Sequence, residues 1–588
     1  MSQASTLLQL GLVHLALTAA PGVAAILLTA RFGRRDTPTL LGVGLAASGL
    51  SAMAVLWAFY ADPTVGKVAA YAVVAASAVV AVTAVRTLGD RVRELGDLLP
   101  PLVLWGLGVL FLLFFGFLHG GTGEPLRLAS VRFSHQLPSD SFLPLSFADW
   151  LYVHGHHGAA PHVGDWLASD RPPLQTAYVL AQRPFAWDTS GLHYQVLGVA
   201  LQLLWIPGLW AVLSAARVRR PTRSLAMVAV LLSDVAIVHG FYVWPKLLAA
   251  AFLLGAAALV LSDGWRDARR RPPLVLLAAC LMGLALLAHG SSVFGIVPIV
   301  AVAVFRGVPN LRLIGTGLAI GALLWVPWAA YQHWVDPPGN RLAKWMLAGS
   351  VPIDTRGTLP TIVDSYESAG VVRVLENKGA NFRTMTGDVS TLDHLGDAVS
   401  STASGDAHHA IRELRDDRFS SLLWSTGLFV AAPFVMLYAF VRRRRRDPAD
   451  WGFALVALAM VALGCVVWGL VLFGNPPART YIHQGTLLLP LLAVAGLVAG
   501  LRAVAPRAAA VFVAVNAASV VALYAPSLDE LPGTRFSYAG ALAASVCLAG
   551  CLAVAALSAR PRRGVGDPGP GAERTVVEPA MATSGATE

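Results

Sequence analysis

A polar segment, residues 119–192, interrupts an otherwise apolar chain, and three of its aspartates and one of its arginines are candidates for chemistry. Asp140 lies in a turn bounded by prolines, and Asp165, Asp170 and Arg171 follow close together. A carboxylate held in an irregular turn can act as a general base or bind a metal, and the arginine fork matches phosphate and carboxylate groups. Structural roles stay open, because Asp140 can form an Asx turn or a helix cap and the Asp170–Arg171 pair can pin the loop.

The same segment carries three histidines, His154, His156 and His157. Imidazole nitrogens bind metals, but this spacing matches no strong metal motif and the neighbouring glycines favour a mobile turn. We interpret these residues as solvated loop histidines. The loop carboxylates would allow a divalent metal, Mg or Mn, but no set of ligands requires one, so we predict no metal site.

Further basic residues stand where apolar stretches end. Lys246 follows a short Tyr-Val-Trp-Pro turn, His289 ends another stretch, and Arg479 and His483 share one connection. Together with Arg171 they could donate hydrogen bonds to a phosphate group. A lysine at a membrane surface can also be a plain interfacial anchor, so both interpretations of Lys246 stay open.

The elements that must position these residues are apolar helices. The chain has 588 residues, of which 56% are hydrophobic and only 13% charged, against about 25% charged in an average soluble domain. The mean hydropathy is +0.62, which predicts an all-α polytopic membrane protein. Forty arginines against four lysines indicate a GC-rich genome and hence a bacterial plasma membrane, and nothing points to nucleic acid.

A membrane-spanning helix needs about 20 mostly apolar residues. About fifteen stretches meet this description: 8–30, 38–60, 65–85, 99–118, 193–215, 224–243, 246–262, 273–289, 292–306, 311–331, 421–440, 452–473, 484–501, 507–524 and 537–558.

The short basic connections predict how these stretches are oriented. Arginine clusters favour the cytoplasmic side, and each one follows an odd-numbered stretch: Arg31–Arg35, Arg86–Arg93, Arg217–Arg223, Arg266–Arg271, Arg442–Arg446 and Arg560–Arg563. The N-terminus is therefore expected outside and the C-terminus inside. Two long loops, 119–192 and 332–420, then lie outside, with short interfacial helices expected at 142–151, 163–167, 341–346 and 361–374.

This layout resembles the GT-C superfamily of integral-membrane glycosyltransferases. In that family one helix leads outward into a long first outer loop with an acidic residue, and six further spans follow. The matching regions here are a seven-span core at 99–331 that includes loop 119–192, and a second outer loop at 332–420. Three additional spans (1–98) precede the core, further spans (421–558) follow it, and the tail 559–588 is expected to be disordered in the cytoplasm.

The resemblance implies transfer of a hexose or pentose from a polyprenyl-phosphate donor to a glycan, lipid or protein acceptor of the cell envelope, with inversion at the outer face. By position, the family's base corresponds to Asp140, with Asp170 and Asp165 as alternatives. Lys246, Arg171, His289, Arg479 and His483 would hold the donor phosphate. The family often places its acid directly after the first helix, whereas here Asp140 comes about 20 residues later.

Two other functions fit the same topology. A transporter or flippase of lipid-linked glycans would carry charged residues along its spans. In this chain the main polar groups within the spans are Asp234, His239 and His289. A ligase that resembles the O-antigen ligases would also use outer loops with arginine and histidine, and it would not need an aspartate base.

Overall fold

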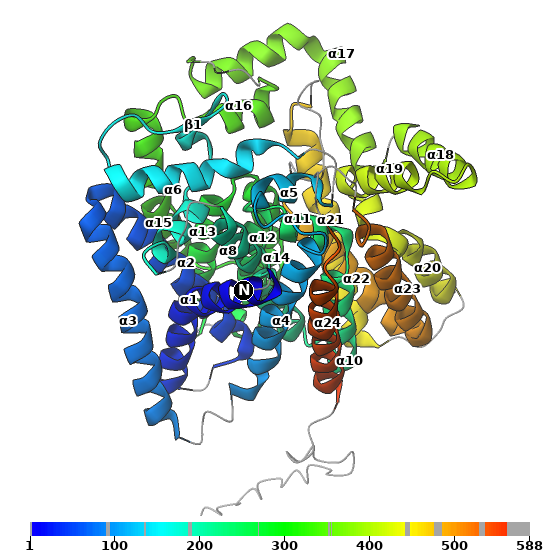
Figure 1. The fold of residues 1–588 in the computed structure, drawn as a ribbon, viewed down its shortest axis with the longest axis horizontal. Helices are drawn as coiled ribbons and strands as arrows, with labels where there is room; N and C mark the ends of the chain where they lie inside the picture. Colours follow the sequence, from blue (N-terminus) through cyan, green and yellow to red (C-terminus); the bar gives the residue numbers. More distant parts are fainter. Residues whose placement is uncertain are drawn as a thin grey trace, which may run out of the picture.

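The chain folds into a bundle of helices, and the computed structural model describes residues 3–560 except 34, 90–94, 134–136, 186–190, 268–269, 351–352, 354, 388, 442–446, 475–481, 483–484 and 528–534. Figure 1 shows the bundle with a further layer of helices along its upper side. Almost all of the predicted tail, 559–588, lies outside the described residues.

Within the described ranges, ten helices or joined helices are long and apolar enough to cross a membrane. This is the architecture of an all-α, multi-pass membrane protein. The ten are α1 (Gln3–Arg31), α2 (Thr37–Ala61), α3 (Pro63–Leu88), α4 (Leu99–Gly116), α8 with α9 (Leu192–Gln202, Trp205–Ala215), α13 (Arg271–Ala288), α15 with the π-helical turn η6 (Leu311–Ala330, Tyr331–Val335), α21 (Pro448–Val471), α23 (Pro506–Tyr524) and α24 (Tyr538–Ala559).

The other five predicted spans are bent or short. Two are helix pairs with sharp bends: α10 (Arg220–Leu231) meets α11 (Asp234–Phe241) at 53°, and α19 (Ala407–Ser420) meets η7 (Trp424–Ala431) with α20 (Ala432–Val441) at 93°. Three are apolar helices of at most 17 residues: α12 (Lys246–Leu261), α14 (Val293–Arg306) with the turn η5 (Gly290–Ser292), and α22 (Leu488–Val504). By length and composition the described chain thus has ten to twelve candidate spans, and fifteen stays a prediction, as does the sidedness.

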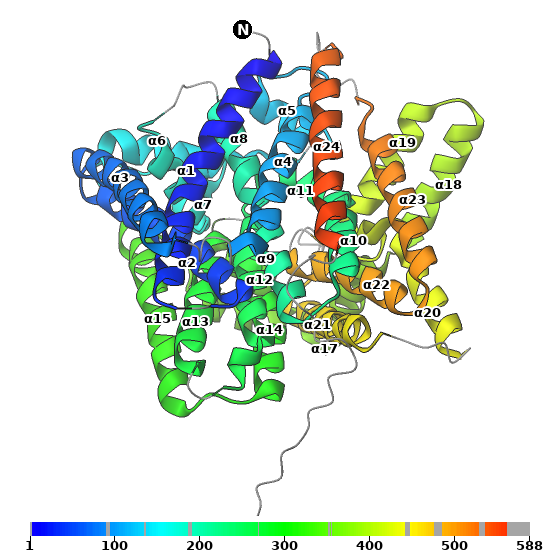
Figure 2. The same ribbon diagram turned by 90° about the horizontal axis from the view of Figure 1, so that it is seen from below.

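Burial separates an inner group of helices from an outer one. All residues of α12 are buried, as are all those of α8. By contrast α3 and α15 expose valines and leucines such as Val68 and Leu318 along most of their length. Exposed apolar faces of this extent suit lipid rather than water. Both Figure 1 and Figure 2 place α3 and α15 on one side of the bundle and α20 and α23 on the other.

The first long loop contains several short elements: α5 (Pro125–Val131), the 3₁₀ turn η2 (Ser139–Phe142), α6 (Leu143–His154), β1 (His162–Val163), β2 (Trp166–Leu167), the turn η3 (Ala168–Asp170) and α7 (Leu174–Gln182). The expected helix at 142–151 corresponds to α6, which begins with Pro144 in its first turn and ends at Gly155 (φ +60°).

The expected helix at 163–167 is wrong, because these residues form a β-hairpin in which Val163 pairs with Trp166. Gly164 has φ +55° and is the first of the two turn residues. A two-residue hairpin turn of type II′ requires a positive φ at that position, which glycine adopts without strain.

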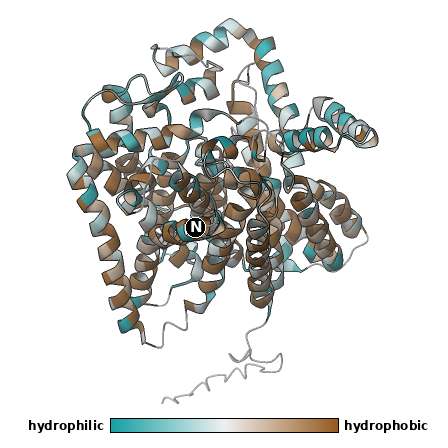
Figure 3. Ribbon diagram, viewed as in Figure 1, coloured by the Kyte–Doolittle hydropathy of each residue, from teal (hydrophilic) through white to brown (hydrophobic). Residues whose placement is uncertain are grey.

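The second long loop consists of α16 (Arg341–Ala348), α17 (Thr358–Thr386), α18 (Val389–Ala403) and α19. The expected helices at 341–346 and 361–374 correspond to α16 and to part of α17, which is kinked at Gly370. Figure 3 shows hydrophilic residues concentrated on α17, α18 and α19, whereas the bundle is mostly hydrophobic.

The two long loops contact each other directly. The Ser169 amide donates to the Asp336 carboxylate at 2.9 Å, and the Ser169 hydroxyl donates to the Asp336 carbonyl at 2.6 Å. The Gln332 side chain completes this junction by donating to the Ser169 carbonyl at 2.8 Å. Segments about 165 residues apart are thereby held together.

Candidate functional site

Both long loops and several helix ends enclose a cavity of about 180 Å³. Four of the eight predicted site residues line it, namely Asp140, Arg171, Lys246 and His289, and three tryptophans lie beside them, Trp166, Trp244 and Trp345. The tryptophans were not predicted as site residues. The sequence placed them in polar segments near apolar stretches, where tryptophan also serves as an interfacial anchor.

Asp140 is nearly inaccessible, with 6% of its surface exposed. One carboxylate oxygen forms an ion pair with the Arg171 guanidinium, and the other accepts a hydrogen bond from the Trp244 indole at 2.9 Å. A buried carboxylate needs such partners to stay charged. Asp140 is therefore held in one orientation by a group from its own loop and one from the turn before α12.

The turn that carries Asp140 is fixed by tyrosines from the bundle. The Tyr194 hydroxyl donates to the Ser141 carbonyl at 2.6 Å and accepts from Gln175 at 2.8 Å. The Tyr242 hydroxyl donates to the Pro138 carbonyl on the other side of the aspartate. Helices α7 and α8 and the end of α11 thus position the loop carboxylate.

Lys246 begins α12, the fully buried helix, and points into the same cavity. Its ammonium group lies 3.7 Å from the centre of the Trp244 ring, a cation–π contact. Gln202 accepts hydrogen bonds from the amides of Leu247 and Leu248 at 3.0 and 3.2 Å. The start of α12 is therefore capped from α8, and the lysine side chain is directed away from that cap.

His289 reaches the cavity from the end of α13. Its Nδ1 atom contacts the Ser291 hydroxyl at 2.6 Å and accepts from the Ser291 amide at 3.2 Å. The Ser291 hydroxyl donates to the Gly485 carbonyl at 3.1 Å. These contacts fix Nδ1, so Nε2 is the ring atom available to a ligand in the cavity.

Two hydrogen-bond donors in the cavity wall are buried and have no partner among the described residues. They are Nε of Arg171 and Nε1 of Trp345. An unsatisfied buried donor costs free energy unless a ligand or water accepts from it. Burial lowers the pKa of Arg171 to about 10, so its guanidinium remains charged at neutral pH and is poorly solvated, as a site for anions requires.

The other two predicted aspartates lie outside the cavity lining. Asp170 is buried and accepts from the Leu167 amide at 2.9 Å, which braces the hairpin, and burial raises the pKa of its carboxyl group. The Asp165 side chain is 78% exposed and lies 3.7 Å from Arg341. Of the three loop aspartates, Asp140 alone lines the described cavity.

A scan of protein-family models, a search of curated proteins and a search of solved structures each found no match to this chain.

Two predicted phosphate-binding residues and the three loop histidines remain to be placed. Arg479 and His483 lie outside the described residues. His154, His156 and His157 are exposed at and after the end of α6, and no group of three or more His, Cys, Asp or Glu side chains in the described part of the chain could hold a metal ion.

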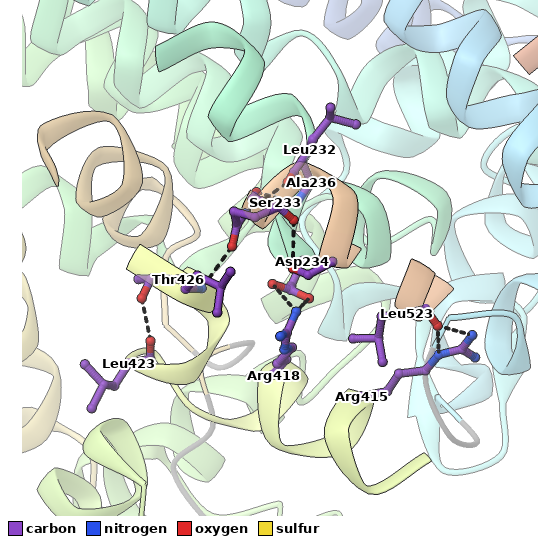
Figure 4. Close-up of polar contacts among 12 residues, drawn as sticks. Leu232, Ser233, Asp234, Ala236, Arg415, Arg418, Leu423, Thr426 and Leu523 are labelled. Carbon is purple, nitrogen blue, oxygen red and sulfur yellow. Dashed lines mark hydrogen bonds and ion pairs between the residues drawn. The ribbon is translucent and has the colours of Figure 1, made fainter. Parts of the chain in front are cut away.

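A second buried aspartate–arginine pair lies inside the bundle, at the break between α10 and α11. Asp234 is 1% exposed and accepts from Arg418 of α19 at 3.1 Å (Figure 4). Ser233 caps α11 by accepting from the Ala236 amide at 3.3 Å. Nearby, Arg415 donates to the Leu523 carbonyl at 2.7 Å. No pattern in the sequence indicates that α19 inserts two arginines here.

Proposed function

We propose that this protein is a membrane glycosyltransferase that moves a sugar from a polyprenyl-phosphate donor to a hydroxyl group of a cell-envelope acceptor. The observation that carries the proposal is one cavity that combines a carboxylate, Asp140, with cationic groups and tryptophans. The cations Arg171 and Lys246 outnumber the single carboxylate, so the cavity favours an anionic ligand such as a phosphodiester.

The chemistry follows from these groups. The Asp140 carboxylate takes the proton of the acceptor hydroxyl as its oxygen bonds to the anomeric carbon, and the bond from that carbon to the phosphate oxygen breaks. The leaving polyprenyl phosphate gains negative charge, which Lys246 and the Nε2 atom of His289 stabilise. Attack opposite to the leaving group inverts the anomeric centre.

Arg171 has two tasks in this proposal. Its ion pair orients the Asp140 carboxylate, and its Nε, which has no partner among the described residues, donates to the donor phosphate. The three tryptophans line the space in which the sugar would lie, and Nε1 of Trp345 donates to a sugar hydroxyl. The surrounding apolar helices accommodate the polyprenyl chain.

The test is sugar transfer by the full-length protein in proteoliposomes. The donor is a polyprenyl phosphate carrying a radiolabelled pentose or hexose, and the acceptor is a cell-wall glycan extract. Asp140→Asn should lower turnover by about 10²–10⁴-fold, the usual contribution of a general base. The matched control Asp165→Asn, on an exposed aspartate of the same loop, should retain activity.

Two outcomes would reject the proposal. Undiminished transfer by Asp140→Asn would remove Asp140 as the base. Movement of the intact labelled lipid across the bilayer, with no sugar released, would instead identify a transporter of lipid-linked sugars.

A further inference from the structure

A second polar hollow, of about 300 Å³, lies where α4 and α10 begin and α24 ends. Three arginines line it, Arg220 and Arg223 from the first turn of α10 and Arg560 directly after α24. These helix ends are far apart in the sequence, so the sequence grouped the arginines only as signals of membrane orientation. The fold gathers them around one space.

The charges in this hollow are not balanced. Asp97 is the one carboxylate among its lining residues. Among the described residues, no carboxylate lies within ion-pair distance of Arg220 or Arg560. Among the described lining residues the arginines therefore exceed the carboxylate by two charges, and such an excess attracts anions.

The Arg223 guanidinium is held in place and has one N–H group that a ligand could accept from. Its guanidinium donates to the Val218 carbonyl at 3.3 Å and lies 5.2 Å from the centre of the Trp210 ring. Its Nε is buried and has no hydrogen-bond partner within the part of the chain that the structure describes. A fixed, partly desolvated guanidinium with an unsatisfied N–H is well suited to bind a phosphate oxygen.

Most of the remaining wall is apolar. Leu99 and Val103 of α4 and Leu557 of α24 belong to helices long enough to cross a membrane, and they line the same space as the arginines. A ligand that fits must carry an anionic head and an apolar body. A soluble phosphate matches only the first requirement, and a nucleic acid has no apolar chain to place against the leucines.

We infer that this hollow binds the phosphodiester headgroup of an anionic membrane phospholipid, with the upper part of its acyl chains against α4 and α24. Basic pockets between membrane helices recognise such headgroups, and the arginine distribution predicts this side to be cytoplasmic, where anionic lipids attract basic residues. The bent α10–α11 pair begins at the hollow and ends at Phe241, shortly before Lys246 in the sequence. The lipid site is therefore separate from the proposed transferase site.

The experiment uses native mass spectrometry of the full-length protein in detergent, titrated with phosphatidylglycerol, with phosphatidylcholine and, separately, with inorganic phosphate. Phosphatidylglycerol should bind in preference to phosphatidylcholine. Arg223→Gln and Arg560→Gln should each weaken that binding by about fivefold, as expected for one basic contact to an anionic lipid. Arg217→Gln is the matched control, because Arg217 is exposed, pairs with Asp263 and lies outside the hollow.

Several results would overturn the inference. Equal affinity for the two lipids would do so, as would unchanged phosphatidylglycerol binding by a variant that lacks all three arginines. Competition by inorganic phosphate as effective as the lipid would identify a soluble anion as the ligand. Gel filtration checks folding, and the exposed Arg560 keeps the test informative if the half-buried Arg223 variant fails to fold.

Discussion

Asp140 and Asp234 are both buried aspartates paired with an arginine, yet their surroundings differ. Asp140 opens on a cavity that also holds Lys246 and unsatisfied donors. Asp234 does not line that cavity and is packed against the backbone, where a Cβ atom added to Gly427 would come within 3.3 Å of its carboxylate.

This difference teaches that a buried ion pair is not in itself a sign of activity. Such pairs often contribute little net stability and still cannot lose one partner cheaply. The pair at Asp234 joins α19 to the break between α10 and α11, and Asn516 supports it by accepting from the Leu428 amide and donating to the Leu232 carbonyl. The pair at Asp140 has space beside it for a ligand.

The largest effect should come from removing Asp234. Asp234→Ala leaves Arg418 without its charge partner and should lower the free energy of unfolding by about 3–5 kcal/mol, with sugar transfer per folded molecule preserved. Asp140→Ala should instead abolish sugar transfer. It should lower the free energy of unfolding by less than Asp234→Ala does, because water in the cavity can reach Arg171. Thermal unfolding in one detergent and transfer assays measure both. A stable but inactive Asp234→Ala protein would break the comparison.

A second test concerns the cation beside Asp140. Lys246→Met retains the packing on Trp244 and removes the charge, so kcat/KM for the donor should fall by about 10–100-fold, mainly through binding of its phosphate. Lys67→Met is the matched control, because Lys67 also lies over an aromatic ring, that of Tyr152, and does not line the cavity. Equal losses in the two variants would argue against a role of Lys246 in donor binding.

A smaller effect should distinguish closed packing from open space. Gly427 and Gly405 both have positive φ, +61° and +86°. A Cβ atom at Gly427 would meet the Asn516 amide oxygen at 2.4 Å, whereas nothing lies within 4 Å at Gly405. Gly427→Ala should therefore destabilise by about 1–3 kcal/mol more than Gly405→Ala in thermal unfolding. Similar losses would show that the packing around Asp234 yields easily.

The smallest expected effect is at Asp170. Burial raises the pKa of its carboxyl group in the folded protein, so the folded state binds this proton more tightly than the unfolded state does. The resulting stability is present at acidic pH and is lost as pH rises through the folded-state pKa. Asp170→Asn should become more stable relative to wild type as pH rises, with transfer unchanged, in unfolding curves measured between pH 4 and 8. A loss of transfer would make Asp170 the base.

The sequence predicted the helices well because apolar stretches of membrane length leave a strong signal. It did not predict the bend at Ser233, since a break inside an apolar stretch barely changes hydropathy, although a serine followed by an aspartate is typical of a helix start. The tryptophan and leucine of the hairpin at 163–167 are also typical of an interfacial helix, and Gly164 is its main turn signal.

The sequence predicts the kinds of residue in the site, but only some of the individual residues. Asp140, Arg171, Lys246 and His289 stood out because charged residues are rare in this chain, and the fold places them around one cavity. Which aspartate faces the cavity depends on the contacts of Tyr194 and Tyr242 with the loop, and such contacts between distant segments leave no local pattern. The sequence also does not predict the insertion of α19 into the bundle, because its many charged residues are typical of a solvated helix surface.

The junction of Ser169 with Asp336 has a consequence for engineering. It fastens one loop to the other beside the cavity, and Trp166 and Trp345 come from different loops. A chimera that takes one loop from another protein would combine half of one cavity wall with half of another. The binding properties of this surface therefore depend on residues of both loops. Directed evolution of the pocket should randomise both loops in the same library.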